Sequence, residues 1–436
     1  MRRHDDAGRI HGLPSGLMKA IRRYPIWLFL IPIFSLGLFF RLFHIGFQSL
    51  WIDEVYTINA ALAVLKHGYP LLDSGYIYVN NFVSVYLAAL MMKIAPFDAF
   101  SPWAVRLPAA LFGSGLILAV ATLGRRLFKS NVVAILAAFF VTFSYNEIAW
   151  SRQARGYAAL AFFLILSICF FWNYLSSGKR RDLFWWIGLF TFACLSHWSG
   201  LAFLPAFLII LWKKKYLYSF ASYKKELLFL GVLVAVPIVT LFITAERMIT
   251  RYIVFPFFPF FVIALSFVVV MCADHILPNY RTATRSLFAL LLLLVIGYQQ
   301  FLFYPMISYD FHVLSIQPDY NEVFSIIKSE KRPDDVIISF CPALHRIYLG
   351  EEGEWLPKGN RRQEKPDFYT GIDPINTLDQ LIDITRSHHG FVVIDGEAPR
   401  SSLTNRVRYI VDNPHIKLEY HSSGYGQNAD IWLYRF

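Results

Sequence analysis

Two adjacent carboxylates, Asp53 and Glu54, follow the first long apolar run of the sequence. A carboxylate at a membrane face is costly to remove from water, so a pair of them there needs a cause. One cause is chemical, because a positioned carboxylate can take the proton of an attacking hydroxyl. The other is structural, because Ser49 can cap a helix and acidic residues are favoured in a helix's first turn. The residues alone leave both interpretations open.

Arginines near the ends of apolar runs form a second group, on the side that the topology below makes the outer one. They are Arg41, Arg106, Arg152, Arg155, Arg247 and Arg251. The planar guanidinium offers a fork of donors that suits phosphate and carboxylate. Arg152 and Arg155 are three apart, so a helix would bring both to one side. Each arginine alone could extend to the interface, and Tyr157 could be an interfacial aromatic residue. Together, the arginines favour a shared anionic ligand.

The composition is that of a membrane protein. Hydrophobic residues make up 56% of the 436 residues, charged residues make up 16%, and the mean hydropathy is +0.45. An ordinary soluble domain has about 25% charged residues. A helix crosses the hydrocarbon core in about 20 residues. We therefore predict about nine transmembrane helices, near residues 24–45, 104–124, 131–147, 157–175, 183–199, 200–212, 226–244, 252–273 and 285–304.

Clusters of Lys and Arg set the direction of these spans. They occupy every second connection, beginning with Arg22 and Arg23 before the first run. This alternation predicts a multi-pass protein of the cell (inner) membrane, with a cytoplasmic N-terminus and an extracytoplasmic C-terminal domain. The apolar stretch 82–95 would break the alternation if it crossed, so we expect it to be a helix lying on the outer face. The net charge of +11 sits in these short clusters, which argues against nucleic-acid binding.

The apolar runs end near Tyr304, so we predict a transmembrane domain over residues 1–304 and an extracytoplasmic α/β domain over residues 305–436. Alternating helical and strand-like segments in the second domain favour a small fold with a mainly parallel sheet. The signals indicate helices over 319–330, from Thr377 onward and over 402–413, and strands over 336–340, 391–394, 416–420 and 431–434. The fold class is therefore mainly α, with a small C-terminal α/β domain.

Short motifs occur in an order that resembles a known family. Leu-Trp-Ile-Asp53-Glu54 follows the first span, and Arg106-Leu-Pro opens the second. Ser-Arg-Gln-Ala-Arg155-Gly-Tyr157 follows the third span, and Arg251-Tyr-Ile-Val-Phe-Pro comes late in the chain. Together they resemble the GT-C superfamily of integral-membrane glycosyltransferases, in the branch of protein O-mannosyltransferases and lipid A aminoarabinose transferases (glycosyltransferase family 39-like). The resemblance covers roughly residues 24–275.

The resemblance implies an inverting enzyme that moves a sugar from a polyprenyl-phosphate donor to an acceptor hydroxyl at the outer face. It implies that Asp53 is the catalytic carboxylate, with Glu54 in the same motif. The phosphate leaves as an anion, so the site needs cations and no general acid. We expect the donor phosphate to be bound by Arg152, Arg155, Arg251, Arg106 and Tyr157. The chain departs from the family at Gln153, where the family often has Glu, and in the short segment between His197 and Arg247.

The predicted partners are a polyprenyl-phosphate-linked sugar donor, an acceptor protein, lipid or glycan, and membrane lipids, without nucleic acid. We expect no cofactor, and no metal-ligand spacing is present, although a divalent metal at Asp53 is compatible with the motif. An alternative function is a transporter or flippase of an anionic lipid-linked substrate. A third is a membrane scaffold that displays the C-terminal domain. Transporters bind near mid-membrane, whereas these charges cluster at one face, which favours the enzyme.

Overall fold

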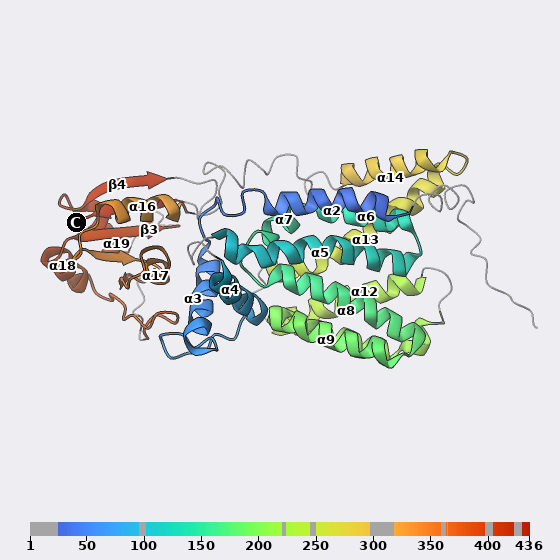
Figure 1. Ribbon diagram of the computed structural model, residues 1–436, viewed down its shortest axis with the longest axis horizontal. Helices are drawn as coiled ribbons and strands as arrows, with labels where there is room; N and C mark the ends of the chain where they lie inside the picture. Colours follow the sequence, from blue (N-terminus) through green and yellow to red (C-terminus); the bar gives the residue numbers. More distant parts are fainter. Residues whose placement is uncertain are drawn as a thin grey trace, which may run out of the picture. The chain divides into compact units, whose positions relative to one another are not determined.

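The computed structural model describes residues 25–95, 102–219, 224–244, 250–296, 318–358, 363, 365–396, 404–422 and 430–436. The chain divides into two compact units (Figure 1). The helical unit comprises residues 1–41, 111–151 and 157–301, and the mixed unit comprises residues 42–110, 152–156 and 302–436. The segment after the first apolar helix thus folds with the C-terminal domain. The predicted boundary near residue 304 lies outside the described residues and stays a prediction.

Apolar helices make up the helical unit, and many of them run side by side in Figure 1. They are α2 (Trp27–Leu42), most of α5 (Pro102–Phe128), α6 (Asn131–Phe143), α7 (Tyr145–Ser151), α8 (Tyr157–Ser177), α9 (Arg180–Ser196), η1 (Trp198–Phe203), α10 (Leu204–Trp212), α11 (Lys214–Leu217), α12 (Lys224–Thr244), α13 (Thr250–Ile276) and α14 (Thr282–Ile296). Within the described residues, each predicted apolar run falls on one or more of these helices, and residues 24 and 297–304 of the first and last runs lie outside the described residues.

Membrane-crossing length is clearest for three of the described helical stretches. Pro102–Phe128, Tyr157–Ser177 and Phe257–Ile276 are long and apolar enough to cross a membrane by length and composition. Shorter apolar helices of 10–17 residues occur at Trp27–Leu42, Phe82–Ile94, Asn131–Phe143, Trp198–Trp212 and Thr282–Val295. A multi-pass membrane protein is therefore confirmed, whereas the exact number of nine crossings stays a prediction.

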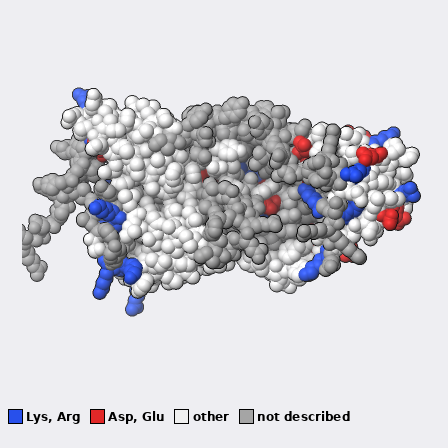
Figure 2. Space-filling view, turned by 180° about the vertical axis from the view of Figure 1, so that it is seen from behind, with Lys and Arg blue, Asp and Glu red and all other residues white. Residues whose placement is uncertain are grey.

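The surface of the helical unit suits a lipid environment. Large apolar side chains such as Phe184, Trp212 and Val295 are more than 70% exposed, which would be unfavourable in water over so wide an area. Figure 2 shows Lys and Arg side chains gathered at one end of this unit, with a largely uncharged surface beside them. Inside, Phe171 contacts the rings of Trp186 and Phe207 at centroid distances of 4.5 and 4.8 Å. Aromatic packing of this kind binds neighbouring helices where lipid removes the hydrophobic driving force.

The mixed unit joins two helices from the N-terminal half of the sequence to the C-terminal domain. Its helices are α3 (Ile52–His67), α4 (Phe82–Ile94), the first turns of α5, α16 (Tyr320–Glu330), α17 (Ala343–Leu349), α18 (Leu378–Ser387) and α19 (Asn405–Asp412). Its strands are β1 (Val336–Ser339), β2 (Glu354–Trp355), β3 (Gly390–Asp395), β4 (Lys417–Ser422) and β5 (Ile431–Arg435). The helix expected over 82–95 is confirmed as α4, and its place on the outer face stays a prediction.

The sheet has the order β2-β1-β3-β5-β4 and is mixed rather than mainly parallel. The pairs β1–β2 and β1–β3 are parallel, whereas β3–β5 and β4–β5 are antiparallel. The prediction of a mainly parallel sheet was therefore wrong. Parallel neighbours need a crossover connection, usually a helix, but β4 and β5 are consecutive in the sequence and pair as antiparallel neighbours do.

Helices cover both faces of this sheet. On one face, α16 and α17 pack through Phe324 and Leu344 against Phe391, and α3 joins the same core through Val55 and Ile58. On the other face, apolar residues of α18 and α19 pack against strand residues. Local signals set the helix starts, because the side chains of Asp319, Thr377 and Thr404 accept hydrogen bonds from backbone N–H groups three residues later. The helix predicted from Thr377 onward is confirmed, and it begins with a capping box between Thr377 and Gln380.

Candidate active site

The first motif lies at the start of α3. The helix begins at Ile52 with Trp51 as its N-cap, and the Trp51 N–H donates to Glu54 Oε2 at 3.0 Å. The expected cap, Ser49, has another role. Its Oγ donates to Asp319 Oδ1 at 3.2 Å and accepts from the Asn321 N–H at 3.0 Å. The C-terminal domain therefore holds the residues that precede the motif.

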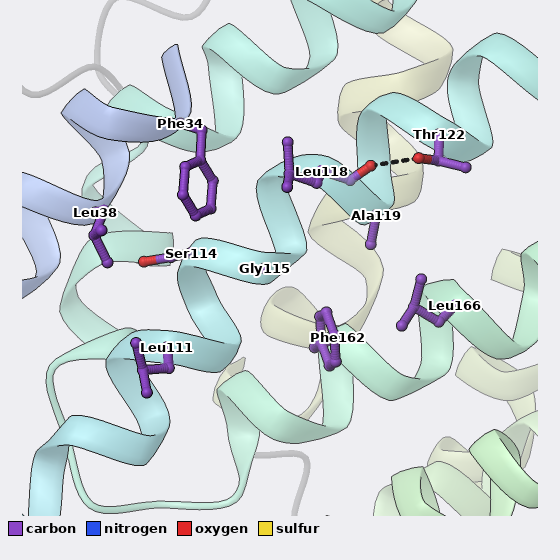
Figure 3. Close-up of a pocket in the computed structure, with 10 residues that line it drawn as sticks. All are labelled: Phe34, Leu38, Leu111, Ser114, Gly115, Leu118, Ala119, Thr122, Phe162 and Leu166. Atoms are coloured by element: carbon purple, nitrogen blue, oxygen red, sulfur yellow. Dashed lines mark hydrogen bonds between the residues drawn. The ribbon is translucent and has the colours of Figure 1, made fainter. Parts of the chain in front are cut away.

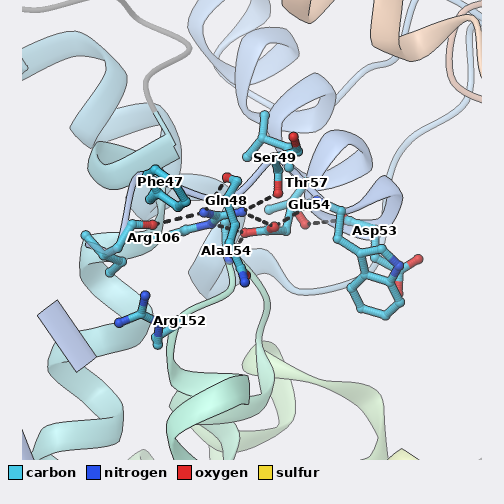
Figure 4. A network of polar contacts seen from close by, with 12 residues as sticks. Phe47, Gln48, Ser49, Asp53, Glu54, Thr57, Arg106, Arg152 and Ala154 are labelled. Atoms are coloured by element: carbon cyan, nitrogen blue, oxygen red, sulfur yellow. Dashed lines mark hydrogen bonds and ion pairs between the residues drawn. The ribbon is translucent and has the colours of Figure 1, made fainter. Parts of the chain in front are cut away.

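Glu54 is enclosed in a network of hydrogen bonds (Figure 4). Arg106 Nε donates to Oε1 and Arg106 Nη2 donates to Oε2, both at 2.8 Å. The Ala154 N–H also donates to Oε1, at 2.7 Å. The side chain of Glu54 is fully buried, and that of Arg106 is 3% exposed. A bidentate pair with these further bonds satisfies a carboxylate that has lost its water.

Arg106 uses all five of its N–H donors inside this network. Both hydrogens on Nη1 donate to backbone carbonyls, those of Ile45 and Gln48, at 2.9 and 3.0 Å. The second Nη2 hydrogen donates to the Ser49 carbonyl at 2.9 Å. Because a guanidinium has five donors, Arg106 has none left over. Arg106 thus fixes the chain between α2 and α3 as well as Glu54.

Asp53 is in a more open environment. Its side chain is 21% exposed, and its Oδ2 lies 3.6 Å from Arg155 Nη2, whose side chain is 10% exposed. Arg155 Nη1 also donates to the Asp53 carbonyl at 2.9 Å, to Thr57 Oγ1 at 3.3 Å and to the Tyr78 hydroxyl at 3.4 Å. Asp53 and Thr57 share one side of α3, where Arg155 binds both. This arrangement leaves part of a carboxylate accessible next to a cation.

Residues 152–156 form bends between helices rather than a helical continuation. α7 ends at Ser151 and α8 begins at Tyr157, so the helical spacing predicted for Arg152 and Arg155 was wrong. The backbone departs from the helix because its N–H groups bind elsewhere, as the Ala154 N–H does with Glu54. Arg152 donates to the Phe43 carbonyl and, at 3.2 Å, to the His44 carbonyl.

The predicted site residue Tyr157 belongs to the helical unit, as does the buried Glu147. Tyr157 is 1% exposed, with ring centroids 4.8 Å from Trp150 and 5.0 Å from His197. Glu147 is fully buried in α7, and neither carboxylate oxygen has a hydrogen-bond partner among the described residues. The side chain of Arg251, like the whole of Arg247, lies outside the described residues. The structure therefore brings Asp53, Glu54, Arg106 and Arg155 into one unit and leaves Tyr157 in the other.

An apolar groove opens on the helical unit (Figure 3). It has a volume of about 390 Å³ and is lined by Phe34, Leu38, Leu111, Ser114, Gly115, Leu118, Ala119, Thr122, Phe162 and Leu166. The hydroxyl of Thr122 donates to the Leu118 carbonyl of its own helix at 2.7 Å, so it does not demand a polar ligand. The groove therefore suits an apolar chain. Among the described residues, no group of three or more His, Cys, Asp or Glu side chains gathers as metal ligands do.

Residues 80–244 match the family described as dolichyl-phosphate-mannose-protein mannosyltransferase. The structure is similar to that of ArnT from Cupriavidus metallidurans in the apo state, with a TM-score of 0.54 and 10% identity over 94% of this chain and 97% of that chain. The same protein bound to undecaprenyl phosphate gives a TM-score of 0.53 and 11% identity, over 96% and 98%. The comparison with curated proteins found no match.

The oligosaccharyltransferase of Archaeoglobus fulgidus is a more distant neighbour, with a TM-score of 0.38 and 17% identity. The match covers 72% of this chain and 40% of that enzyme, so the chain spans two fifths of its length. The chain therefore shares the fold of ArnT, and its residues 80–244 are similar in sequence to the mannosyltransferase family. The matched family segment covers less than half of this chain, whereas the fold shared with ArnT extends over most of it, in agreement with the resemblance of the motifs.

Sequence reasoning missed the contribution of the C-terminal domain to the motif. The Leu50 N–H donates to the Tyr348 hydroxyl at 3.1 Å, and that hydroxyl donates to Asn321 Oδ1 at 3.1 Å. Tyr348 lies 298 residues from Leu50, and no local pattern signals a contact over that separation. The only hint was chemical, because a Tyr hydroxyl that is buried needs a partner.

Proposed function

We propose that the protein transfers a sugar from a polyprenyl-phosphate donor to an acceptor hydroxyl at the outer membrane face, with inversion. Asp53 accepts the proton of the acceptor hydroxyl as its oxygen forms a bond to the anomeric carbon. The bond from that carbon to the phosphate oxygen breaks, and the polyprenyl phosphate leaves as an anion. The contrast between the two neighbouring carboxylates carries this proposal, because Asp53 is partly accessible whereas Glu54 is buried and fully hydrogen-bonded.

The same contrast divides the arginines into two roles. Arg106 has no spare donor for a phosphate, so we assign it to the support of Glu54. Arg155 stands beside the Asp53 carboxylate, where it can hold the base in place and meet developing negative charge. We retain Arg152, Arg155 and Arg251 as the proposed phosphate ligands, with Tyr157 as a further candidate.

The helical unit supports a lipid-linked donor. Its open groove is apolar, which a polyprenyl chain requires (Figure 3). ArnT, whose fold this chain shares, has a structure with undecaprenyl phosphate bound. A transporter of an anionic lipid would need charges along its membrane helices, whereas Asp53, Glu54, Arg106 and Arg155 gather in the mixed unit. We place the N-terminus in the cytoplasm and the C-terminal domain outside.

The test compares Asp53→Asn, Asp53→Glu and Glu54→Gln with the wild-type protein, purified and supplied with a polyprenyl-phosphate sugar. Asp53→Asn keeps the size of the side chain and removes the base, so turnover of the donor should fall by roughly 10²–10⁴-fold without loss of folding. Asp53→Glu should restore part of it. Glu54→Gln should lower thermal stability more than Asp53→Asn does. Full turnover by Asp53→Asn would exclude Asp53 as the base.

A further inference from the structure

A loop of the C-terminal domain, residues 367–371, is built to hold one conformation. Asp367 Oδ2 accepts from the N–H groups of Tyr369 and Thr370 at 3.1 and 2.9 Å, and from the Thr370 hydroxyl at 2.9 Å. The Gly371 N–H donates to the Asp367 carbonyl at 2.8 Å, which closes the turn. Gly371 has a φ of 76°, a conformation that glycine adopts at no steric cost. We call this segment the tyrosine loop.

The tyrosine loop is fastened to the connection between α3 and α4. The Ser74 hydroxyl donates to the Phe368 carbonyl at 2.5 Å. A Cβ at position 371 would stand 3.2 Å from the Cα of Ser74, so the two backbones are in close contact. Next to Ser74, Asp73 pairs with Arg346 of α17. These contacts fix the loop of the C-terminal domain relative to α3, which carries the candidate catalytic motif.

Tyr369 extends from this loop to the neighbourhood of Asp53. Its ring stacks on Tyr56 with a centroid distance of 3.7 Å and an interplanar angle of 2°. It also lies 6.2 Å from the ring of Tyr78, whose hydroxyl accepts from Arg155, the partner of Asp53. Tyr56 is three residues after Asp53 on the same helix. A side chain of the C-terminal domain therefore packs on the helix that carries Asp53, next to the Tyr78 ring whose hydroxyl binds Arg155.

The Tyr369 hydroxyl is neutral and keeps its proton. Burial raises its pKa well above the usual 10, and the hydroxyl of Tyr78 raises it further. The Arg155 charge lowers the pKa of this hydroxyl and the Asp53 charge raises it. A neutral hydroxyl can donate one hydrogen bond and accept others. It is a suitable contact for a hydroxylated ligand.

Beside Tyr369, a second aromatic pair is open to solvent. The rings of Tyr76 and Phe368 stack at a centroid distance of 5.3 Å. Their exposed fractions are 51% and 42%. Aromatic rings offer large, rigid and amphipathic contact area, which suits the flat C–H faces of sugar rings together with their hydroxyls.

We propose that Tyr369 is an acceptor-binding residue, supplied by the C-terminal domain to the Asp53 site, and that the acceptor is a saccharide. This inference rests on the proposed function. The tyrosine loop belongs to the C-terminal domain and not to the apolar helices, so it meets the water-soluble substrate rather than the polyprenyl chain. The aromatic surface formed by Tyr76 and Phe368 extends the contact beyond the attacked hydroxyl.

The experiment uses the full chain in detergent, with a polyprenyl-phosphate sugar as donor and methyl glycosides as acceptors. Transfer to the glycoside and hydrolysis of the donor by water are measured together. Tyr369→Ala should lower the ratio of transfer to hydrolysis. It should also raise the acceptor KM, on the order of tenfold for one lost aromatic contact. Tyr369→Phe should recover part of the loss through its ring. Tyr280→Ala, at an exposed position in the helical unit, is the matched control and should leave the partition unchanged.

The outcomes separate this inference from the proposed function. If the wild-type protein never consumes the donor, the proposed function is wrong. If it consumes the donor and Tyr369→Ala lowers hydrolysis and transfer equally, Tyr369 supports Asp53 and does not bind the acceptor. If the wild-type protein uses serine-containing peptides and no methyl glycoside, the saccharide assignment is overturned. Melting curves of each variant show that the changes occur in folded protein.

Discussion

The Glu54–Arg106 pair and the Asp53–Arg155 pair both join a carboxylate of α3 to an arginine, but their surroundings differ. Glu54 and Arg106 are bidentate at 2.8 Å and almost completely buried, and each makes further hydrogen bonds. The carboxylate of Asp53 approaches Arg155 only at 3.6 Å and is 21% exposed. A saturated pair can hold a structure together but has no capacity to bind or exchange a proton with a ligand. The looser pair keeps that capacity.

The two adjacent carboxylates therefore have different roles. Successive residues of a helix point about 100° apart, so Asp53 and Glu54 must face different surroundings. Glu54 faces Arg106 and the bends at residues 152–156, and it joins them to the start of α3. Asp53 lies beside Arg155, which also donates to Thr57 and to Tyr78, and the ring of Tyr78 is a neighbour of Tyr369. The buried carboxylate thus anchors the start of the helix that carries Asp53.

The largest expected effect comes from removing the arginine of the saturated pair. Arg106→Ala leaves the Glu54 carboxylate buried without its counter-ion and frees three carbonyls, so it should destabilise the protein by about 3–5 kcal/mol. Arg155→Ala should cost only about 1 kcal/mol of stability, because its partner reaches water. Turnover should instead fall by about 10²–10³-fold, as for the loss of an electrostatic contact to the transition state. Thermal melting and donor turnover of both variants measure the two quantities.

The contrast between the two pairs would be wrong if Arg106→Ala and Arg155→Ala lost stability and donor turnover to the same extent. Arg106→Lys is the useful intermediate, because lysine keeps the charge and loses the planar fork. It should melt between the wild-type protein and Arg106→Ala. A stable Arg106→Ala protein with abolished turnover would instead place Arg106 at the donor phosphate, as the sequence first suggested.

His345 is buried without a hydrogen bond to any described residue, whereas the buried Arg106 uses all of its donors. It is fully buried in α17, neither ring nitrogen has a hydrogen-bond partner among the described residues, and a Cβ at Gly353 would overlap the ring. Burial lowers its pKa from 6.5 to about 3. The unfolded chain therefore binds a proton at higher pH than the folded chain does. Stability should be complete above pH 6.5 and decline below it, by about 2 kcal/mol at pH 5.

Melting curves at pH 7 and pH 5 measure this effect. His345→Phe removes the titrating ring, so the part of the pH dependence that belongs to residue 345 should disappear. His388 is an exposed histidine of the same domain, and His388→Phe is the control that should keep the full slope. An unchanged slope in His345→Phe would show that His345 has a partner in solution.

The positions of helices could be predicted from the sequence more accurately than the contacts between distant residues. Apolar runs and caps such as Asp319 and Thr377 are local signals, and the corresponding helices formed where expected. Long-range pairing was less accessible: the mixed sheet depends on β5 lying between β3 and β4. In the site, the motif indicated Asp53 and Glu54 but not which one is enclosed. That difference depends on Arg106 and the Ala154 N–H, which lie 52 and 100 residues from Glu54.

The smallest expected effect concerns Tyr348, which links the C-terminal domain to the residues before the motif. Tyr348→Phe keeps the ring, which stacks on Phe324 at 4.8 Å, and removes the hydroxyl that binds the Leu50 N–H and Asn321. One or two hydrogen bonds of this kind contribute about 1 kcal/mol each, so melting should shift by a few degrees at most. Because Leu50 adjoins Ser49, whose carbonyl binds Arg106, turnover should fall modestly through a lower kcat with an unchanged acceptor KM.

Tyr409→Phe, on the other face of the sheet, is the matched control and should leave kcat unchanged. A raised acceptor KM in Tyr348→Phe would instead place Tyr348 with Tyr369 at the acceptor.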